Sequence, residues 1–170
     1  MKGVILLVAF VMICSNLPAQ DDFNVPVLTQ EEKQQILYNH VIAYAASGIS
    51  FAVTKEVSAE EYGRYVGKLF TPFWNPEDGF PAFAGGLMYI LAGMHPNNEM
   101  TIISQDENSV TFKLKNVTIA FSEGPFLGVT AREFLDCSYG MIDELAKHMN
   151  VEFQHKITDD GWYVVSMKAM

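Results

Sequence analysis

The residues most able to do covalent chemistry are one cysteine and a few histidines. Cys137 lies in the stretch REFLDCSYGM, and His148 follows eleven residues later. A cysteine nucleophile and its histidine base must approach within about 3 Å. Eleven residues of one continuous helix span about 16 Å along its axis, so His148 does not reach Cys137. A base would have to be His40, His95 or His155, and the spacing alone identifies no catalytic residue.

Cys137 also fits the apolar face of a helix. The apolar residues Phe134, Cys137, Met141 and Leu145 follow one another at steps of three or four residues. Free cysteine behaves as a small hydrophobic residue. Cys137 also lies past the first turn, where the helix dipole does little to lower the pKa of a thiol. We therefore expect Cys137 in the core, with a reactive thiol as the alternative.

A second group of candidates has the polar and aromatic side chains that suit a ligand pocket. His155 shares a strand face with Phe153, on the side expected to meet the helices, where its imidazole bonds to a core partner or anchors a ligand. His40 and Tyr44 lie one turn apart on the first helix. Aromatic residues are dense from 70 to 83. Core packing is the alternative for each. The expected ligand-binding residues are His40, Tyr44, Trp74, Phe83, Cys137 and His155.

The sequence lacks the common signatures of metal and cofactor sites. Glu144 and His148 lie at i and i+4 on one helix, but no third ligand falls at a matching spacing. We interpret them as a solvated ion pair. HExxH, G-x-S-x-G, Walker, dinucleotide-binding and EF-hand patterns do not occur. We expect neither a metal site nor a cofactor.

Composition indicates one acidic globular domain. Of the 170 residues, 49% are hydrophobic and 18% are charged, and the net charge is −9. This hydrophobic content is enough to build a core, so a disordered chain is not expected. A chain this acidic repels phosphate backbones. We therefore expect no nucleic acid among its partners.

The first 20 residues have the parts of a secretory signal peptide. Lys2 is followed by an apolar run from Gly3 to Cys14 and by a polar end with the small residue Ala19. The run is shorter than the roughly 20 residues of a membrane span. Processing as a lipoprotein at Cys14 is disfavoured by the bulky Ile13. We expect an exported protein, periplasmic or secreted, with a single domain over 21–170 and no stable membrane span after signal removal.

Three capping boxes mark the starts of three helices. Thr29, Ser58 and Thr130 each precede a glutamate by three residues and stand ahead of an apolar periodic run. We expect helices over about 30–54, 59–73 and 131–149. A further apolar helix is expected over 81–94, with Pro81 in its first turn. In the first helix the expected buried stripe is Leu37, Val41, Tyr44, Gly48 and Phe51. In the second, Gly63 and Gly67 would permit close approach of another backbone.

Strand signals occupy the rest of the chain. Residues 100–105 and 109–115 have strand character, which is expected to resume over 117–121. Two further strands, 151–157 and 162–168, flank an Asp-Gly turn typical of a hairpin. Helices and strands come in runs, so the expected class is α+β. It has three N-terminal helices, then a mainly antiparallel sheet of four to five strands, with one further helix before the C-terminal hairpin.

The part from 109 to 168 resembles a known group of domains in its layout. The segments VTFKLKNV, REFLDCSYGMIDELAKHMNVEF and GWYVVSMK are similar in order to the L-2-amino-thiazoline-4-carboxylic acid hydrolase-like and 4-vinyl-reductase-like group. The resemblance implies strands before a helix and a hairpin after it, around a small-molecule site. The chain departs from the group in its cysteines, since only Cys137 would remain after signal removal.

These observations favour one function and leave two alternatives. The leading hypothesis is an exported α+β domain that binds a small, partly apolar molecule between helices and sheet. The first alternative is a hydrolase related to the group named above, using Cys137 or a histidine. The second is an interaction or structural module without a ligand. The sequence also leaves open a homodimer as the assembled form.

Overall fold

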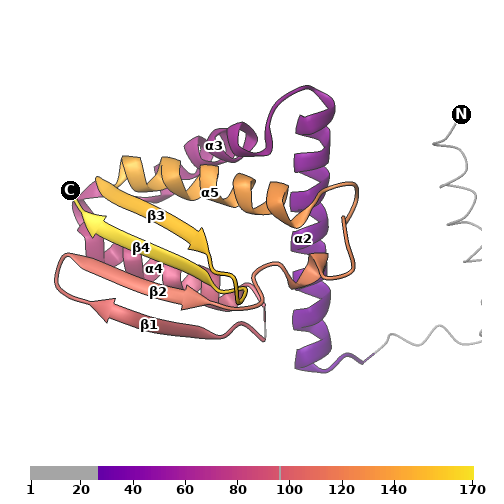
Figure 1. Ribbon diagram of the computed structural model, residues 1–170, viewed down its shortest axis with the longest axis horizontal. Helices are drawn as coiled ribbons and strands as arrows, with labels where there is room; N and C mark the ends of the chain where they lie inside the picture. The colour runs from indigo at the N-terminus through magenta and orange to yellow at the C-terminus, as the bar shows by residue number, and fades with distance from the viewer. Residues whose placement is uncertain (1–26, 96) are drawn as a thin grey trace, which may run out of the picture.

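The protein is an α+β domain of four helices and a four-stranded sheet within the residues that the computed structural model describes, 27–95 and 97–170 (Figure 1). The signal peptide expected over 1–20 lies outside these residues. The helices and strands are α2 Gln30–Thr54, α3 Ala59–Phe70, α4 Gly79–Gly93, β1 Met100–Gln105, β2 Ser109–Leu114, α5 Ala131–His148, β3 Val151–Ile157 and β4 Tyr163–Ala169. Three short 3-10 turns, η1 Thr71–Phe73, η2 Pro76–Asp78 and η3 Ile119–Phe121, connect them.

All three expected capping boxes are present. The hydroxyls of Thr29, Ser58 and Thr130 each accept from the backbone N–H of the glutamate three residues later, at 3.2 Å. That glutamate in turn accepts from the backbone N–H of the capping residue. Two orphan donors are thereby satisfied at the start of α2, α3 and α5, which fixes where each helix begins.

The helix expected over 59–73 ends earlier, at Phe70. Pro72 has no N–H to donate to the carbonyl of Lys68. The hydroxyl of Thr71 donates to that carbonyl instead, at 2.8 Å. The last three residues of the expected range therefore form the 3-10 turn η1.

The sheet is antiparallel, with strand order β1-β2-β4-β3. The closing hairpin joins β3 to β4, as the Asp-Gly turn predicts. The expected fifth strand over 117–121 was wrong, because this segment contains the turn η3. Asn116 has a φ of 66°, which turns the chain away from the sheet after β2.

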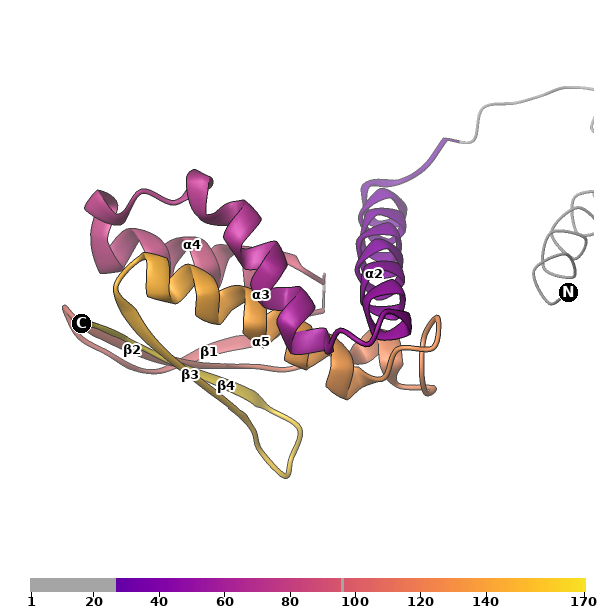
Figure 2. The same cartoon turned by 90° about the horizontal axis from the view of Figure 1, so that it is seen from above.

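Helices cover one face of the sheet and leave the other face to solvent. α4 and α5 lie against the sheet, and α3 lies on the outer side of α5 (Figure 2). Phe112 and Val165 of the central strands point into this layer and are fully buried. Along β2 the burial alternates residue by residue. We call this the main core, and it positions α5 and the end of α4.

Close packing of α3 on α5 depends on glycine. A Cβ atom at Gly63 would lie 2.0 Å from the backbone oxygen of Cys137, and one at Gly140 would lie 2.2 Å from that of Glu60. The two backbones approach to a distance that only glycine permits. The expected packing role of Gly63 is confirmed, together with that of Gly67, whose Cβ would lie 2.7 Å from the oxygen of Met141.

α2 stands at one end of the molecule, across the start of α5 (Figures 1 and 2). The stripe expected to be buried was wrong for this helix, because Leu37, Val41, Tyr44 and Phe51 are all exposed. A second face of α2, which includes Tyr38, lies against η3 and the start of α5. We call this cluster the second core. Its members from α2 are Tyr38, Ile42, Ala46 and Ile49.

By length and composition, α2 is also long and apolar enough to cross a membrane. Its mean hydropathy over the most apolar window is 1.4. Such a helix also occurs as a core helix of a soluble protein, and Ile42, Ala46 and Ile49 are buried against the domain. The absence of a membrane span after signal removal stays a prediction.

Candidate functional site

The six residues expected to bind a ligand do not meet in one place. His40 and Tyr44 lie on α2, and the Tyr44 side chain is 80% exposed. Cys137 lies on α5 and His155 on β3. The remaining two, Trp74 and Phe83, pack against each other. Their roles as ligand contacts stay predictions, and each local environment decides what the side chain can do.

Trp74 and Phe83 form part of the main core. Their rings meet edge to face with centroids 5.2 Å apart, and Phe83 has no exposed surface. A Cβ at Gly86 would lie 2.7 Å from the indole of Trp74, so this ring closes directly over α4. His148 holds the segment in place through its Nε2, 2.8 Å from the carbonyl oxygen of Trp74. The solvated pair expected between His148 and Glu144 is replaced by this contact.

Cys137 belongs to α5, and its side chain packs against the second core. Burial raises its pKa to about 11. A thiol with this pKa stays protonated at neutral pH, whereas the thiolate is the nucleophile. The environment of Cys137 therefore opposes covalent chemistry and agrees with the packing role.

His155 lies between α5 and the sheet. Its ring stacks on Tyr139 with centroids 4.2 Å apart and lies 5.3 Å from the ring of Tyr163. Nδ1 of His155 and the hydroxyl of Tyr163 are buried without a hydrogen-bond partner among the described residues. Burial is the main cause that lowers the pKa of His155, which favours the neutral ring.

A groove of about 610 Å³ runs beside His155, between α5 and β3. Its lining contains Arg132, Asp136 and Lys156, and Arg132 pairs with Asp136 at 2.9 Å. These charges are already matched or solvated. The groove therefore offers a mixed surface with four charged side chains, and the free Nδ1 of His155 is covered rather than presented to it.

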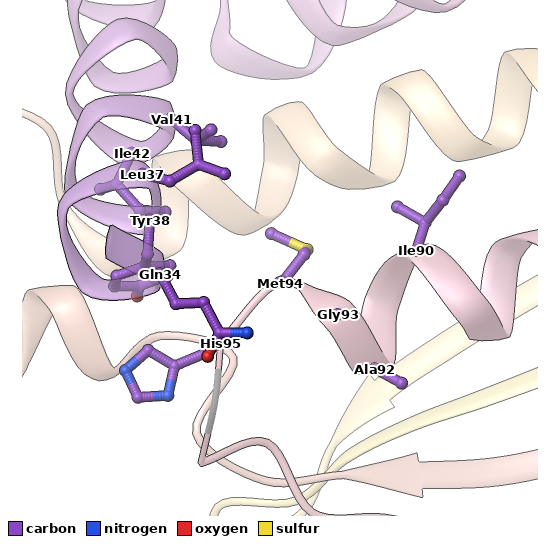
Figure 3. Close-up of a pocket in the computed structure, with 10 residues that line it drawn as sticks. All are labelled: Gln34, Leu37, Tyr38, Val41, Ile42, Ile90, Ala92, Gly93, Met94 and His95. Carbon is purple, nitrogen blue, oxygen red and sulfur yellow. The ribbon is translucent and has the colours of Figure 1, made fainter. Parts of the chain in front are cut away.

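A hollow of different character lies between α2 and the end of α4 (Figure 3). It measures about 510 Å³ and is open on one side. Figure 3 shows Val41 and Ile90 on its two walls, with Met94 between them and His95 at the chain's exit from α4. The lining residues are Gln34, Leu37, Tyr38, Val41, Ile42, Ile90, Ala92, Gly93, Met94 and His95.

Two polar rings are buried at this hollow. His95 is 7% exposed and Tyr38 is 9% exposed. Their rings meet edge to face with centroids 4.5 Å apart. Sequence analysis missed this pair, because His95 follows a helix end and Tyr38 lies off the stripe that was expected to be buried. The only sequence signal was a histidine and two asparagines directly after an apolar helix.

The hydrogen bonds at the junction define which polar atoms remain free. The backbone N–H of Asn97 donates to Nδ1 of His95 at 3.0 Å, so the neutral ring carries its proton on Nε2. Nδ2 of Asn98 donates to the carbonyl of Leu91 at 2.8 Å, which leaves Oδ1 as its unpaired atom. The Tyr38 hydroxyl makes no hydrogen bond of normal geometry among the described residues, although the backbone N–H of Ala120 is near enough to be a weak donor to it.

Burial raises the pKa of Tyr38, and the nearby backbone amide of Ala120 opposes this rise. The phenol is therefore a neutral hydroxyl at any physiological pH. Tyr38, His95 and Asn98 also line a narrow recess behind Met94, next to the hollow. Two donors, the phenol O–H and Nε2–H, and one acceptor, Oδ1 of Asn98, gather at this junction.

A second hollow, about 570 Å³, lies on the other side of Tyr38. Asn39 and His40 of α2 line it together with Ala120 and Phe126. His40 therefore lies near the junction, although the hollow shown in Figure 3 does not include it. Over 27–95 and 97–170, His, Cys, Asp and Glu side chains form no group of three able to hold a metal ion.

Comparison with known proteins gives no family. No family model matches the chain, and no curated protein matches it. The Fe(II) unliganded H-NOX protein from K. algicida is 15% identical, covers 95% of this chain and 84% of its own, and has a TM-score of 0.36. An alanine-to-glycine mutant of that protein is 14% identical, covers 95% of this chain and 84% of its own, and has a TM-score of 0.35. A Cs H-NOX mutant with 4-cyano-L-phenylalanine is 14% identical, covers 93% of this chain and 82% of its own, and has a TM-score of 0.31. Likeness at these TM-scores assigns neither a family nor a function to this chain.

Proposed function

We propose that the protein binds a small, partly apolar molecule in the hollow between α2 and the end of α4. The observation that carries this proposal is the pair of buried polar rings, Tyr38 and His95, at one side of an apolar-walled hollow. The ligand would place its apolar body against Val41, Ile42 and Ile90. Its polar group would face the Tyr38–His95 pair.

The energetics of the free side chains support a ligand at this place. A buried polar group without a partner costs about 1–3 kcal/mol. The Tyr38 hydroxyl and Oδ1 of Asn98 both carry this cost in the described residues. Both atoms are covered in this conformation, so a ligand would have to displace lining side chains to supply the missing partners and recover part of this cost. The apolar walls add about 25 cal/mol for each Å² of apolar surface that the ligand removes from water.

The charge of the lining favours a neutral ligand. None of the described residues around the hollow is Lys, Arg, Asp or Glu. A carboxylate or an ammonium group would find no opposite charge here and would lose its hydration. A hydroxyl, a carbonyl or a carboxamide on an apolar body matches the donors and the acceptor at the junction. The proposed class is therefore a neutral, partly apolar molecule.

This site differs from the location expected from the sequence, since it lies between two helices rather than between helices and sheet. The proposal also keeps the expected export to the periplasm or the exterior, which rests on the composition of residues 1–20. An exported binding domain of this kind would capture its ligand outside the cytoplasm.

The test is native mass spectrometry of the protein purified from its own host, with two matched variants. Ile90→Asp places a charge on the wall of the hollow. Tyr89→Asp places the same charge on the adjacent residue, which is 83% exposed and outside the lining. We expect a bound small molecule on the wild type and on Tyr89→Asp, and its loss from Ile90→Asp. A wild type that carries no ligand, or one that Ile90→Asp retains equally, contradicts the proposal.

A further inference from the structure

The outer side of α2 presents a row of large apolar side chains to solvent. We call Leu37, Val41, Tyr44 and Phe51 the outer stripe. Their exposed fractions are 64%, 51%, 80% and 65%. From residue 34 to residue 54 the helix contains no Lys, Arg, Asp or Glu. The stripe therefore carries no charge between Lys33 and Lys55, and Gly48, on the same face between Tyr44 and Phe51, lies against Tyr62 of α3.

The area of this surface reaches the size of the apolar patches with which proteins bind partners. An aromatic side chain presents about 150–250 Å², so Tyr44 and Phe51 together leave roughly 200–350 Å² uncovered. Leu37 and Val41 extend the patch, and Ile36 at 41% and Ile90 at 51% flank it. Contiguous apolar patches above about 300–600 Å² mark interaction surfaces. A surface near 800 Å² per partner is typical of a stable complex.

We propose that the outer stripe is covered by the outer stripe of a second copy of this chain, with the two α2 helices antiparallel. The stripe repeats at steps of four and three residues through Leu37, Val41 and Tyr44, the spacing with which helices pack on helices. Leu37 and Phe51 lie seven residues to either side of Tyr44. An antiparallel pair centred on Tyr44 therefore brings Leu37 against Phe51 of the partner subunit, twice by symmetry.

The other face of α2 argues against a lipid occupant. Ile42, Ala46 and Ile49 are buried in the second core, so lipid cannot surround the helix while the domain is folded. The net charge of −9 also opposes approach to an anionic membrane. A second copy brings an apolar surface of matching length, which no charged surface supplies.

The geometry has an electrostatic consequence at the two ends of the stripe. Lys33 and Lys55 lie eleven residues to either side of Tyr44. The antiparallel pair therefore places Lys33 near Lys55 of the partner subunit, again twice. Both side chains lie at the rim, where like charges repel weakly and salt screens them. The dimer should tighten as salt is added.

The first test measures mass by sedimentation velocity over a concentration series of the full chain. Tyr44→Glu puts a charge at the centre of the proposed interface, and Gln35→Glu puts it on an exposed site of α2 about 180° around the helix from Tyr44. We expect wild type and Gln35→Glu to dimerise, and Tyr44→Glu to dissociate at least about tenfold more readily. Monomeric wild type at all concentrations, or a dimer that Tyr44→Glu leaves unchanged, overturns the proposal.

The second test looks for a gain of association. Lys33→Glu would convert the repulsion with Lys55 of the partner subunit into attraction and tighten the dimer by about two- to fivefold at low salt. Lys168→Glu makes the same charge change on β4 and should leave the affinity unchanged. Equal effects of the two variants contradict the antiparallel pairing. Binding of wild type to phosphatidylcholine vesicles that Tyr44→Glu abolishes would identify lipid as the occupant and overturn it as well.

The dimer and the ligand site are separable in these experiments. Leu37 and Val41 border the hollow as well as the stripe, whereas Lys33 and Tyr44 are not among the residues that line the hollow. The variants used here therefore leave the proposed ligand contacts in place. A wild type that stays monomeric at all concentrations but carries the bound molecule would reject this inference alone.

Discussion

The imidazole of His155 is the clearest titratable group that folding moves away from water. It stacks on Tyr139, and its Nδ1 is buried without a partner in the described part of the chain. Burial lowers its pKa below the ordinary value of 6.5, Asp136 opposes this shift, and Arg132 adds to it. The folded protein therefore holds the ring neutral at a pH where the unfolded chain begins to bind protons.

This difference predicts a pH dependence of stability. Below about pH 6.5 the unfolded chain binds more protons at this position than the folded chain does. The free energy of unfolding should therefore fall as the pH drops from 6.5 through the lowered pKa of His155, and recover as it rises. His155→Phe keeps an aromatic ring but no titration. Urea unfolding of both proteins over a pH series measures the effect, and identical slopes would contradict it.

Cys137 makes a second prediction at the residue scale. Because burial raises its pKa to about 11, the thiolate is scarce at neutral pH. Iodoacetamide should modify Cys137 slowly in the folded protein and rapidly after denaturation in urea. Peptide mass spectrometry of residue 137 at a series of times gives both rates. Comparable rates in the two states would mean that the thiol is accessible and activated, which would return the hydrolase alternative to consideration.

At the scale of elements, α3 and α5 are joined by a contact that has no room for a methyl group. A Cβ at Gly63 would lie 2.0 Å from a backbone oxygen of α5. Gly63→Ala therefore forces the two helices apart and should destabilise the protein by about 3 kcal/mol, the upper part of the range for overpacking. The midpoint of urea unfolding, with the slope compared to wild type, measures this change.

Gly85→Ala is the matched control for the Gly63 variant. Gly85 lies in α4, and a Cβ there meets nothing within 4 Å. Alanine in place of glycine inside a helix gains about 0.5–1 kcal/mol. The two substitutions should thus have opposite signs. A loss of stability from both would show that the glycine effect is one of backbone conformation and not of the contact between helices.

The contrast between α2 and the other helices shows what sequence patterns can predict about this fold. Capping boxes depend on residues three apart, and all three predicted helix starts are confirmed. Which face of α2 is buried depends instead on where η3 and α5 lie in space. The helix has two apolar faces, and the bulkier one, with Leu37 and Phe51, is exposed while Ala46 and Ile49 are buried. Periodicity cannot choose between two such faces.

The candidate site could not be predicted from the sequence, for a related reason. Tyr38 and His95 meet only because α2 crosses near the end of α4, and no local pattern encodes that crossing. The residues that were predicted from local pattern, Trp74 and Phe83, proved to be core neighbours. His40 came close, since it shares a helix with Tyr38 and lines the hollow on its other side.

At the scale of the whole molecule, the two cores meet through α5. Leu135 and Ile142 of this helix belong to the main core with the sheet, whereas Phe134 belongs to the second core with α2. The second core is smaller, and α2 is exposed along most of its other sides. We therefore expect α2 to open locally while the sheet stays folded.

Amide hydrogen exchange followed by mass spectrometry can measure this difference with two core variants. Ile49→Ala removes apolar contacts of the second core at a local cost of about 2–5 kcal/mol. It should speed exchange in α2 and η3 and leave the slowest amides of β2 and β4 nearly unchanged. Phe112→Ala, in the main core, costs about 3–5 kcal/mol and should speed exchange everywhere, because opening of the sheet leaves α2 nothing to pack against. If Ile49→Ala accelerated the sheet amides as much as those of α2, the two cores would be one cooperative unit. The hollow beside Tyr38 would then be as rigid as the sheet, rather than able to open for a ligand.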